Sequence, residues 1–545
     1  MSKETHSLLD ELKRTIVFFD ETSAQRKLNV LEKCSHLKLS NPKFILQYHN
    51  ALLFVLGYCE NEKVYAAAEK EMERISDLVK KLSPDKKEIL DRSGIVFSET
   101  QGAYSLTLVK WLLERYPDQI SIHSFDEEGT HPKEVLKYVL PEMEFEIASD
   151  EKLKSLKWLE KVSGIKKKND LLKWLVKHID RINATDLIKD QLFESLQLFI
   201  NIKPKEKEFS KTFGNFSLHK NFYHPQGLLK KFDERELINR KLPSPKKLSE
   251  KEKNNIIEKS RVALALLNRE TDPITYCTAD GLLVYELEHG LSIALFSMLP
   301  ERRLPLESYI GFVMFKNGYP MAYGGGWLFG NRSLLGINIF EQFRGGESAF
   351  VFCQLLRSYK QSFGANYFEV EPYQFGKDNP EGLQSGAFWF YYRFGFRPVD
   401  ESLNKLALQE ADKIKNTKGY RTSIEILKQF TKSNIWVNFE DNEKPINPSQ
   451  ISKYITEKIA KDFSGDRIAA EKFCLKIIEK ELGIKKSGTG LKKLGLFVGL
   501  CIDFKKVSAS EKNKLKDFVL QKGESEFKYI ALCKAVNFQK FLRIN

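Results

Sequence analysis

The chain has 545 residues, of which 42% are hydrophobic and 29% are charged, and its formal net charge is +14. This length predicts more than one domain, and the hydrophobic fraction is typical of a globular protein. No run of about 18 or more apolar residues occurs, so we expect no membrane-spanning helix and no membrane partner. The 73 acidic residues interrupt the basic ones, which favours a solvated surface over a nucleic-acid-binding face.

The seven cysteines are scattered along the chain without a close pair. This pattern favours a reduced environment over a disulfide framework. The first residues are polar and lack the basic start and the apolar core of a signal peptide. We therefore expect a cytoplasmic protein. No spacing of His or Cys is typical of a zinc site, so we also expect no metal.

Residues 1–202 show the hydrophobic periodicity of helices. The clearest windows are 44–56, 64–82, 106–116, 154–162 and 171–182. Pro117 ends the third of these windows, because proline cannot continue a helix. We interpret residues 1–202 as a helical domain, and its helices are candidate surfaces for a protein partner.

Residues 203–250 form a polar, lysine-rich stretch. Four prolines interrupt it: Pro204, Pro225, Pro243 and Pro245. Clusters of proline and polar residues between periodic segments indicate loops. This stretch is therefore predicted to be a polar linker with little core of its own.

A helix over 251–267 is predicted next, followed by two hairpins. Their strands are expected at 282–287 and 291–298, and at 308–315 and 321–329. Asn317-Gly318 is a strong hairpin signal, and His289 lies in the other turn, where it is not expected to act as a ligand. Gly324-Gly325-Gly326 indicates a β-bulge, or else a close approach of the backbone to a ligand.

A strand, a glycine turn and a helix follow in that order. The strand is expected at 334–340, and Arg344-Gly345-Gly346 can form the turn, since glycine adopts backbone angles closed to other residues. One apolar helix face is formed by Ala349, Phe352, Leu356, Tyr359 and Phe363. The unpaired amides at the start of such a helix carry a partial positive charge, which suits a phosphate group.

The chain then alternates between strand and helix. Residues 366–371 alternate like a strand, and 383–394 form a predicted helix with an aromatic face. Gly395 is placed to end that helix in the left-handed conformation, before a short strand at 396–399. Helical signals return from residue 401 to the end of the chain, as at 451–463 and 468–482.

Two motifs in this region resemble those of the GNAT N-acetyltransferase superfamily, over at most about a quarter of the chain. The first family motif reads Arg or Gln, two residues, Gly, one residue, then Gly or Ala. Arg344 and Ala349 match it, and Glu347 occupies the glycine position. The second reads Ala, two residues, Phe-Tyr, three residues, Gly-Phe. It is matched by Ala387, Phe390, Tyr391, Gly395 and Phe396. A carboxylate at position 347 would repel a pyrophosphate unless it points away.

The resemblance implies acetyl-CoA or another acyl-CoA as co-substrate. The end of the strand, at Ile339 and Phe340, would hold the pantetheine arm, and Tyr391 would protonate the departing thiolate. The pyrophosphate would bind at Arg344, Gly345, Gly346, Ser348 and Ala349. The family normally places two helices between the strand that ends at Met298 and the next strand, and here only residues 299–307 are available. Either the helix at 251–267 replaces one of them, or this chain is a divergent branch.

An amine acceptor also needs a base that takes its proton. Glu341 lies at the end of one predicted strand, and Glu369 and Glu371 share a face of the next. Apolar neighbours on that strand could raise the pKa of either carboxyl group, as a base requires. The alternative role for Glu369 and Glu371 is an ion pair with an arginine such as Arg393 or Arg397.

The sequence therefore predicts an α+β multidomain protein. Its regions are a helical domain at 1–202, a polar linker at 203–250, a GNAT-like acyltransferase domain at 251–400 and a helical region at 401–545. The function best supported is acyl-CoA-dependent N-acyl transfer to an unidentified amine, by direct attack on the thioester. The alternatives are a non-catalytic GNAT-like binding or scaffold protein, and a transferase that uses aminoacyl-tRNA as donor.

Overall fold

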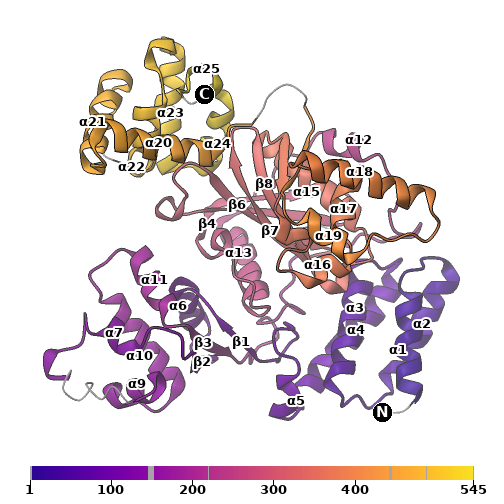
Figure 1. Ribbon diagram of the computed structural model, residues 1–545. Helices are drawn as coiled ribbons and strands as arrows, with labels where there is room; N and C mark the ends of the chain where they lie inside the picture. The colour runs from indigo at the N-terminus through magenta and orange to yellow at the C-terminus, as the bar shows by residue number, and fades with distance from the viewer. Residues whose placement is uncertain (1–2, 145–152, 219, 441–444, 486–487, 544–545) are drawn as a thin grey trace.

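The chain folds around a mixed eight-stranded sheet with helical regions on its sides (Figure 1). The computed structural model describes residues 3–144, 153–218, 220–440, 445–485 and 488–543. The strand order is β10-β11-β9-β8-β7-β6-β5-β4, in which β8 and β9 are parallel. The strands are β4 Cys277–Glu286, β5 Leu291–Met298, β6 Ser308–Lys316, β7 Tyr319–Phe329, β8 Arg332–Ile339, β9 Tyr367–Val370, β10 Arg397–Pro398 and β11 Ile435–Asn438. The predicted α+β class is confirmed.

Both predicted hairpins form, and their turn residues explain why. Asn317 and Gly318 have φ angles of 48° and 83°, as a two-residue turn between β6 and β7 requires. His289 and Gly290 adopt similar angles, 59° and 67°, between β4 and β5. Local turn chemistry thus determines the register of the antiparallel half of the sheet.

The glycine run in β7 is not a bulge. Gly324, Gly325 and Gly326 pair with β6 and β8 without a shift in register. A side chain at Gly324 would collide with the carbonyl oxygen of Gly336, and one at Gly326 would lie 2.6 Å from the Tyr359 ring. The predicted bulge is therefore wrong. The glycines are needed because β8 and helix α15 (Ser348–Phe363) pack closely against this strand.

The first helices lie beside the sheet (Figure 1, indigo). They are α1 Lys3–Thr15, α2 Glu21–Ser35, α3 Pro42–Gly57, α4 Glu62–Lys80 and α5 Pro84–Glu88. Asn41 and Asn61 cap α3 and α4 by accepting hydrogen bonds from first-turn amides, which confirms both predicted helices. α3 packs against η2 (Glu341–Phe343), the 3-10 turn that follows β8.

Residues 100–202 contain a small sheet with a core of its own. Its strands, in the order β1-β3-β2, are β1 Thr100–Ala103, β2 Ile120–Phe125 and β3 Leu198–Ile202. The helices packed around it are α6 Leu106–Arg115, α7 Pro132–Leu136, α9 Ser155–Ser163, α10 Lys168–Asp180 and α11 Asp186–Ser195. The prediction of helices throughout 1–202 missed this sheet. Its strands are short, and Thr100 pairs with the distant Ile202.

The segment 203–250 is not a linker without core residues. It has one described helix, α12 Glu234–Asn239, and otherwise follows an irregular path. Lys211 and His224 are only 4% and 2% exposed, because the segment packs against the first helices and the large sheet. Its prolines predict the irregular backbone correctly, but the burial depends on surfaces from elsewhere in the chain.

The predicted helix at 251–267 is confirmed as α13 Glu250–Ala265, which α14 Asp272–Thr275 follows. α13 packs against β4, at the edge of the large sheet. The connection between β5 and β6 contains a single 3-10 turn, Pro300–Arg302, and no α-helix. That connection therefore supplies no α-helix of its own, and α13 precedes β4 in the chain.

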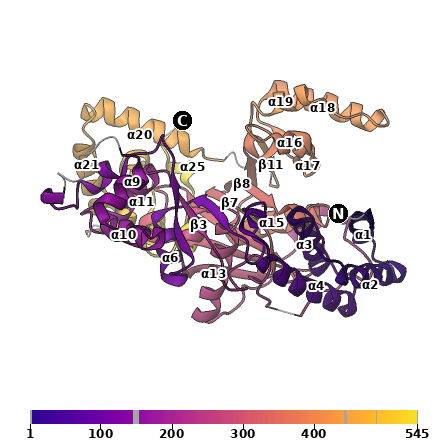
Figure 2. The ribbon, with the colours of Figure 1, turned by 90° about the horizontal axis from the view of Figure 1, so that it is seen from below.

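The large sheet extends beyond the predicted boundary at residue 400. β11 inserts between β9 and β10, after α18 Glu401–Asn416 and α19 Ile424–Phe430. The last helices are α20 Pro448–Phe463, α21 Arg467–Leu482, α22 Thr489–Leu496, α23 Ala509–Glu524, α24 Glu526–Ala535 and α25 Phe538–Phe541. Figure 2 shows this group well apart from α18 and α19. In the part of the chain that the structure describes, no helix combines the length and the apolar character needed to cross a bilayer.

Candidate active site

The strands β8 and β9 part near the centre of the sheet. They pair over three positions, from Arg332–Tyr367 to Leu334–Glu369. Residues 335–339 of β8 have no partner in β9. Gln374, in the 3-10 turn η3 (Pro372–Phe375), covers part of the free edge, and its Oε1 accepts a hydrogen bond from Ile337 N at 3.3 Å.

A cavity of about 1040 Å³ lies at this divergence. Its walls come from the free end of β8, the start of α15, α16 (Pro380–Gln384), α17 (Ala387–Arg393) and α19. Four residues assigned to a site from the sequence line it: Ile339, Arg344, Ser348 and Tyr391. The volume is at the upper end of the range for ligand cavities.

The first turn of α15 presents unpaired amides beside the cavity. The N–H groups of Ser348, Ala349 and Phe350 have no acceptor among the described residues, and Ser348 lines the cavity. Gly345, just before the helix, has a φ of +85°, and a side chain there would meet open space. This helix start can therefore bind an anionic group.

The Glu347 carboxylate is buried and does not line the cavity. Its Oε2 lies 2.9 Å from Lys316 Nζ, and both side chains are 0% exposed. Its Oε1 accepts a hydrogen bond from Leu229 N at 2.8 Å, while its own amide donates to Tyr58 Oη at 3.3 Å. The charge that would repel a pyrophosphate is thus neutralised by a lysine inside the core.

Two histidines complete the cluster around Glu347. His224 Nδ1 and His289 Nδ1 lie 3.7 Å and 3.6 Å from its Oε1. Burial alone would raise the pKa of Glu347, but His289 and the Lys316 ammonium outweigh it and lower that pKa to about 2. Burial, together with the Lys316 charge, lowers the pKa of His224 to about 4. The sequence assigned His289 no role, because its neighbours here come from distant segments.

His224, His289 and Glu347 offer ligand atoms within 4.8 Å of one another, a set that suits a divalent cation. However, the Lys316 ammonium already contacts the same carboxylate, and it donates to the His289 carbonyl oxygen at 2.6 Å. A second cation would face that ammonium at short range. We therefore interpret the cluster as a buried ion pair flanked by two histidines.

Several residues assigned to cofactor binding have other contacts. Gly346 packs on Tyr58, whose ring would lie 2.6 Å from a side chain at that position. Phe340 is 8% exposed and belongs to the main core. Arg344 forms an ion pair with Glu381, and its Nε donates to the Ile339 carbonyl oxygen at 2.9 Å. A ligand phosphate at Arg344 would have to replace Glu381.

Tyr391 lines the cavity from α17 and is 4% exposed. The predicted helix at 383–394 is divided at Gly386, which has a φ of +65°, so Tyr391 lies on the second of two short helices. Its hydroxyl has no hydrogen-bond partner in the described ranges. Burial raises the pKa of Tyr391, so the hydroxyl keeps its proton at neutral pH. It can donate that proton to an atom held in the cavity.

The three candidate bases have different surroundings. Glu341 is exposed in η2, and within the described chain its carboxylate has no hydrogen bond or ion pair. Glu369 is held by Arg332, 2.8 Å away, and by Asn434, instead of by the expected arginines of α17 and β10. Glu371 is exposed and does not line the cavity. Of the three, Glu341 combines a free carboxylate with a position at the end of β8.

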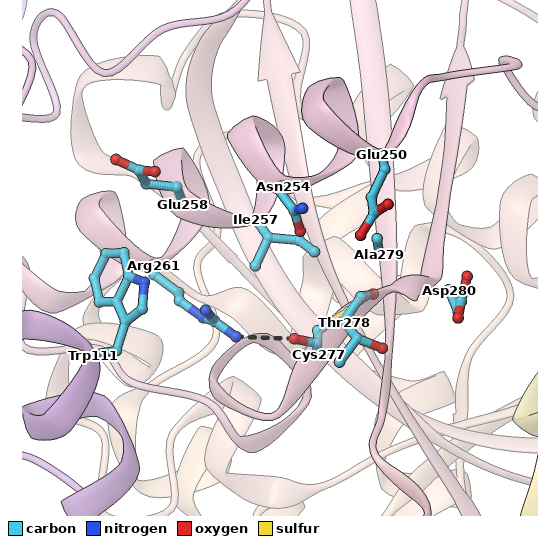
Figure 3. Close-up of a pocket in the computed structure, with 10 residues that line it drawn as sticks. All are labelled: Trp111, Glu250, Asn254, Ile257, Glu258, Arg261, Cys277, Thr278, Ala279 and Asp280. Carbon is cyan, nitrogen blue, oxygen red and sulfur yellow. Dashed lines mark hydrogen bonds between the residues drawn. The ribbon is translucent and has the colours of Figure 1, made fainter. Parts of the chain in front are cut away.

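A separate pocket of about 470 Å³ lies between α6, α13 and the start of β4 (Figure 3). Arg261 donates hydrogen bonds to the carbonyl oxygens of Thr275 and Cys277, both at 2.9 Å, and lies 5.6 Å from the centre of the Trp111 ring. These contacts join α13 to β4 and to the small sheet unit. None of the residues assigned to a site from the sequence lines this pocket.

Comparisons with protein-family models, with curated proteins and with solved structures found no match. The cavity between β8 and β9 is therefore the feature from which a function can be inferred.

Proposed function

We propose that the chain is an acyl-CoA-dependent N-acyltransferase that transfers an acetyl or similar short acyl group to an amine. The observation that carries this proposal is the parting of β8 and β9 around the large cavity. The free amides of α15 lie on one side of that cavity, and Tyr391 lies on another. The GNAT-like motifs in the sequence assign those same two elements to acyl-CoA.

Each wall of the cavity has a distinct role in this proposal. The amides of Ser348, Ala349 and Phe350 bind the pyrophosphate of the cofactor. The unpaired edge of β8 holds the pantetheine arm by backbone hydrogen bonds, after Gln374 releases the Ile337 amide. Burial of Glu347 with Lys316 keeps its carboxylate from opposing the phosphates.

The reaction forms a C–N bond and breaks the C–S bond of the thioester. The amine nitrogen attacks the thioester carbonyl, and the sulfur leaves as a thiolate. Tyr391 donates its proton to that sulfur, since its hydroxyl is protonated and unpaired. Glu341 takes the proton from the amine, directly or through a water molecule.

A non-catalytic role for the same fold is the second candidate. Two contacts favour it: Gln374 covers the β8 edge, and Glu381 covers Arg344. Thermal melting with acetyl-CoA distinguishes the two functions. A ligand at 100 times its dissociation constant stabilises the native state by about 2.7 kcal/mol. No change in melting temperature with any short acyl-CoA at millimolar concentration would favour the non-catalytic role.

The helix start offers a sharper test of cofactor binding. Ser348→Glu places a carboxylate beside the free amides, and we expect it to weaken acetyl-CoA binding at least tenfold. The fold should be retained, because an acidic residue in the first turn of a helix is stabilising. Ser348→Gln is the matched neutral control and should keep most of the affinity. Equal affinity in the two variants, measured by calorimetry, would remove this helix start from the site.

A further inference from the structure

A second cavity, of about 420 Å³, adjoins the large one at the end of β8. Arg269, Asn338, Arg344 and Glu381 line both cavities. The smaller cavity continues to α3, to the turn after α5 and to Lys211. Glu341, the candidate base, lines it as well. A molecule placed there would lie beside the end of β8, and neither Tyr391 nor any other residue of α17 lines this smaller cavity.

Lys211 is the unusual residue of this smaller cavity. Its side chain is 4% exposed, yet its ammonium has no hydrogen bond or ion pair with any described residue. The charge of Glu341 acts on this ammonium without a direct contact, and the Phe340 ring centre lies 5.7 Å away. This nearly buried side chain lines the cavity with an unpaired charge, which is costly to desolvate, so an anionic ligand in the cavity would be favourable.

Some of the other charged groups that line the smaller cavity are already paired, and some are not. Asp91 accepts a hydrogen bond from Gln101 N at 3.0 Å and lies 3.4 Å from Arg92. Arg344 is paired with Glu381. Arg269 is exposed and has no side-chain partner in the ranges described, and the same is true of Glu341. Two cations and one carboxylate are thus free to meet a ligand.

We propose that this cavity is the acceptor site, and that the acceptor is an amine carrying a carboxylate or a phosphate. Lys211 and Arg269 bind the anionic group, while Glu341 receives the ammonium end and takes its proton. The two cavities meet at Asn338, near the end of β8, where the amine reaches the thioester in the neighbouring cavity. This inference rests on the proposed acyltransferase function.

The test uses the full-length protein and pairs of amines that differ only in the anionic group. Glycine is compared with glycinamide, and O-phosphoethanolamine with ethanolamine. Acyl transfer is followed as release of free CoA from acetyl-CoA. We expect kcat/KM to be at least tenfold higher for the anionic member of one pair. The pair that shows this difference tells whether the site prefers a carboxylate or a phosphate. Equal rates within both pairs would overturn the proposal.

Lys211→Met keeps the length of the side chain and removes its charge. We expect at least a tenfold higher KM for the preferred anionic amine and little change for its neutral counterpart. The variant should melt at the same or a higher temperature, because an unpaired buried charge has been removed. Lys247→Met, at an exposed lysine of the same segment, is the matched control and should behave like the wild type.

Arg269→Gln changes an exposed side chain and gives a second test that does not depend on the core. Arg269→Gln should also raise the KM for the preferred anionic amine. Unchanged KM values in both variants, with acetyl-CoA still stabilising the protein, would overturn the acceptor site but leave the acyltransferase function standing. Stabilisation by the anionic amine without any acyl-CoA binding would instead overturn the acyltransferase function. Melting temperatures measured separately with each compound distinguish these outcomes.

Discussion

Replacing Tyr391 by Phe is expected to lower acyl transfer by about 10²–10⁴-fold, the usual effect of losing a general acid. Tyr391 lines the large cavity, and its hydroxyl keeps its proton at neutral pH and has no partner among the described residues. Without it the thiolate leaves unprotonated. The aromatic ring, which packs 5.5 Å from Phe352, stays in place, so acetyl-CoA affinity should be nearly unchanged. The measurement is the rate of CoA release with the best acceptor.

Tyr392→Phe is the matched control for this experiment. The two tyrosines are adjacent, but Tyr392 does not line the cavity, and its ring stacks against the Arg397 guanidinium at 3.7 Å. Its hydroxyl should therefore be dispensable. If both variants were equally active, Tyr391 would be a core residue and some other group would have to protonate the sulfur.

Glu347→Gln is expected to lower the free energy of unfolding by about 3–5 kcal/mol. The substitution leaves Lys316 charged, fully buried and without its counter-ion, and breaking a buried pair from one side is strongly destabilising. Urea unfolding followed by circular dichroism gives the value. Restoring the glycine that the GNAT motif has at this position should destabilise the protein for the same reason, and so should not strengthen cofactor binding.

Glu341→Gln provides the matched control, because it removes an exposed carboxylate only six positions away. Its free energy of unfolding should stay within about 0.5 kcal/mol of the wild type. A loss below about 1 kcal/mol in Glu347→Gln would mean that Lys316 gives up its proton instead of remaining charged. A neutral amine would then take the place of the buried ammonium in that variant.

The shifted pKa of Glu347 predicts how the stability of the fold depends on pH. The pKa of Glu347 falls from 4.5 to about 2 on folding, so its contribution is fully present above pH 4.5. That contribution is lost as the pH falls from 4.5 towards 2, since the unfolded state then takes up a proton that the native carboxylate does not bind. The difference in unfolding free energy between wild type and Glu347→Gln should shrink over this range. A difference independent of pH would show that the Glu347 charge is not what stabilises the fold.

Local sequence features predicted much of the fold and part of the candidate site. Asn317-Gly318 produces the β6–β7 hairpin because both residues accept positive φ angles. The apolar face of α15 and the strand before it follow from periodicity, which depends on neighbouring residues alone. The resemblance to the GNAT motifs assigned Ile339, Ser348 and Tyr391 to one site, and the structure brings all three to one cavity.

Contacts between distant segments decided the rest. No local signal pairs Glu347 with Lys316 or brings the Tyr58 hydroxyl to its amide, and these contacts set the direction in which the carboxylate points. The insertion of β11 into the large sheet and the existence of the small sheet depend equally on remote partners. Hydrophobic periodicity and turn chemistry act over a few residues, so the sequence by itself determined most of the helices and the β4–β5 and β6–β7 hairpins. The charge pairing and the second cavity exist only where folding brings remote segments together, and tertiary structure alone decided them.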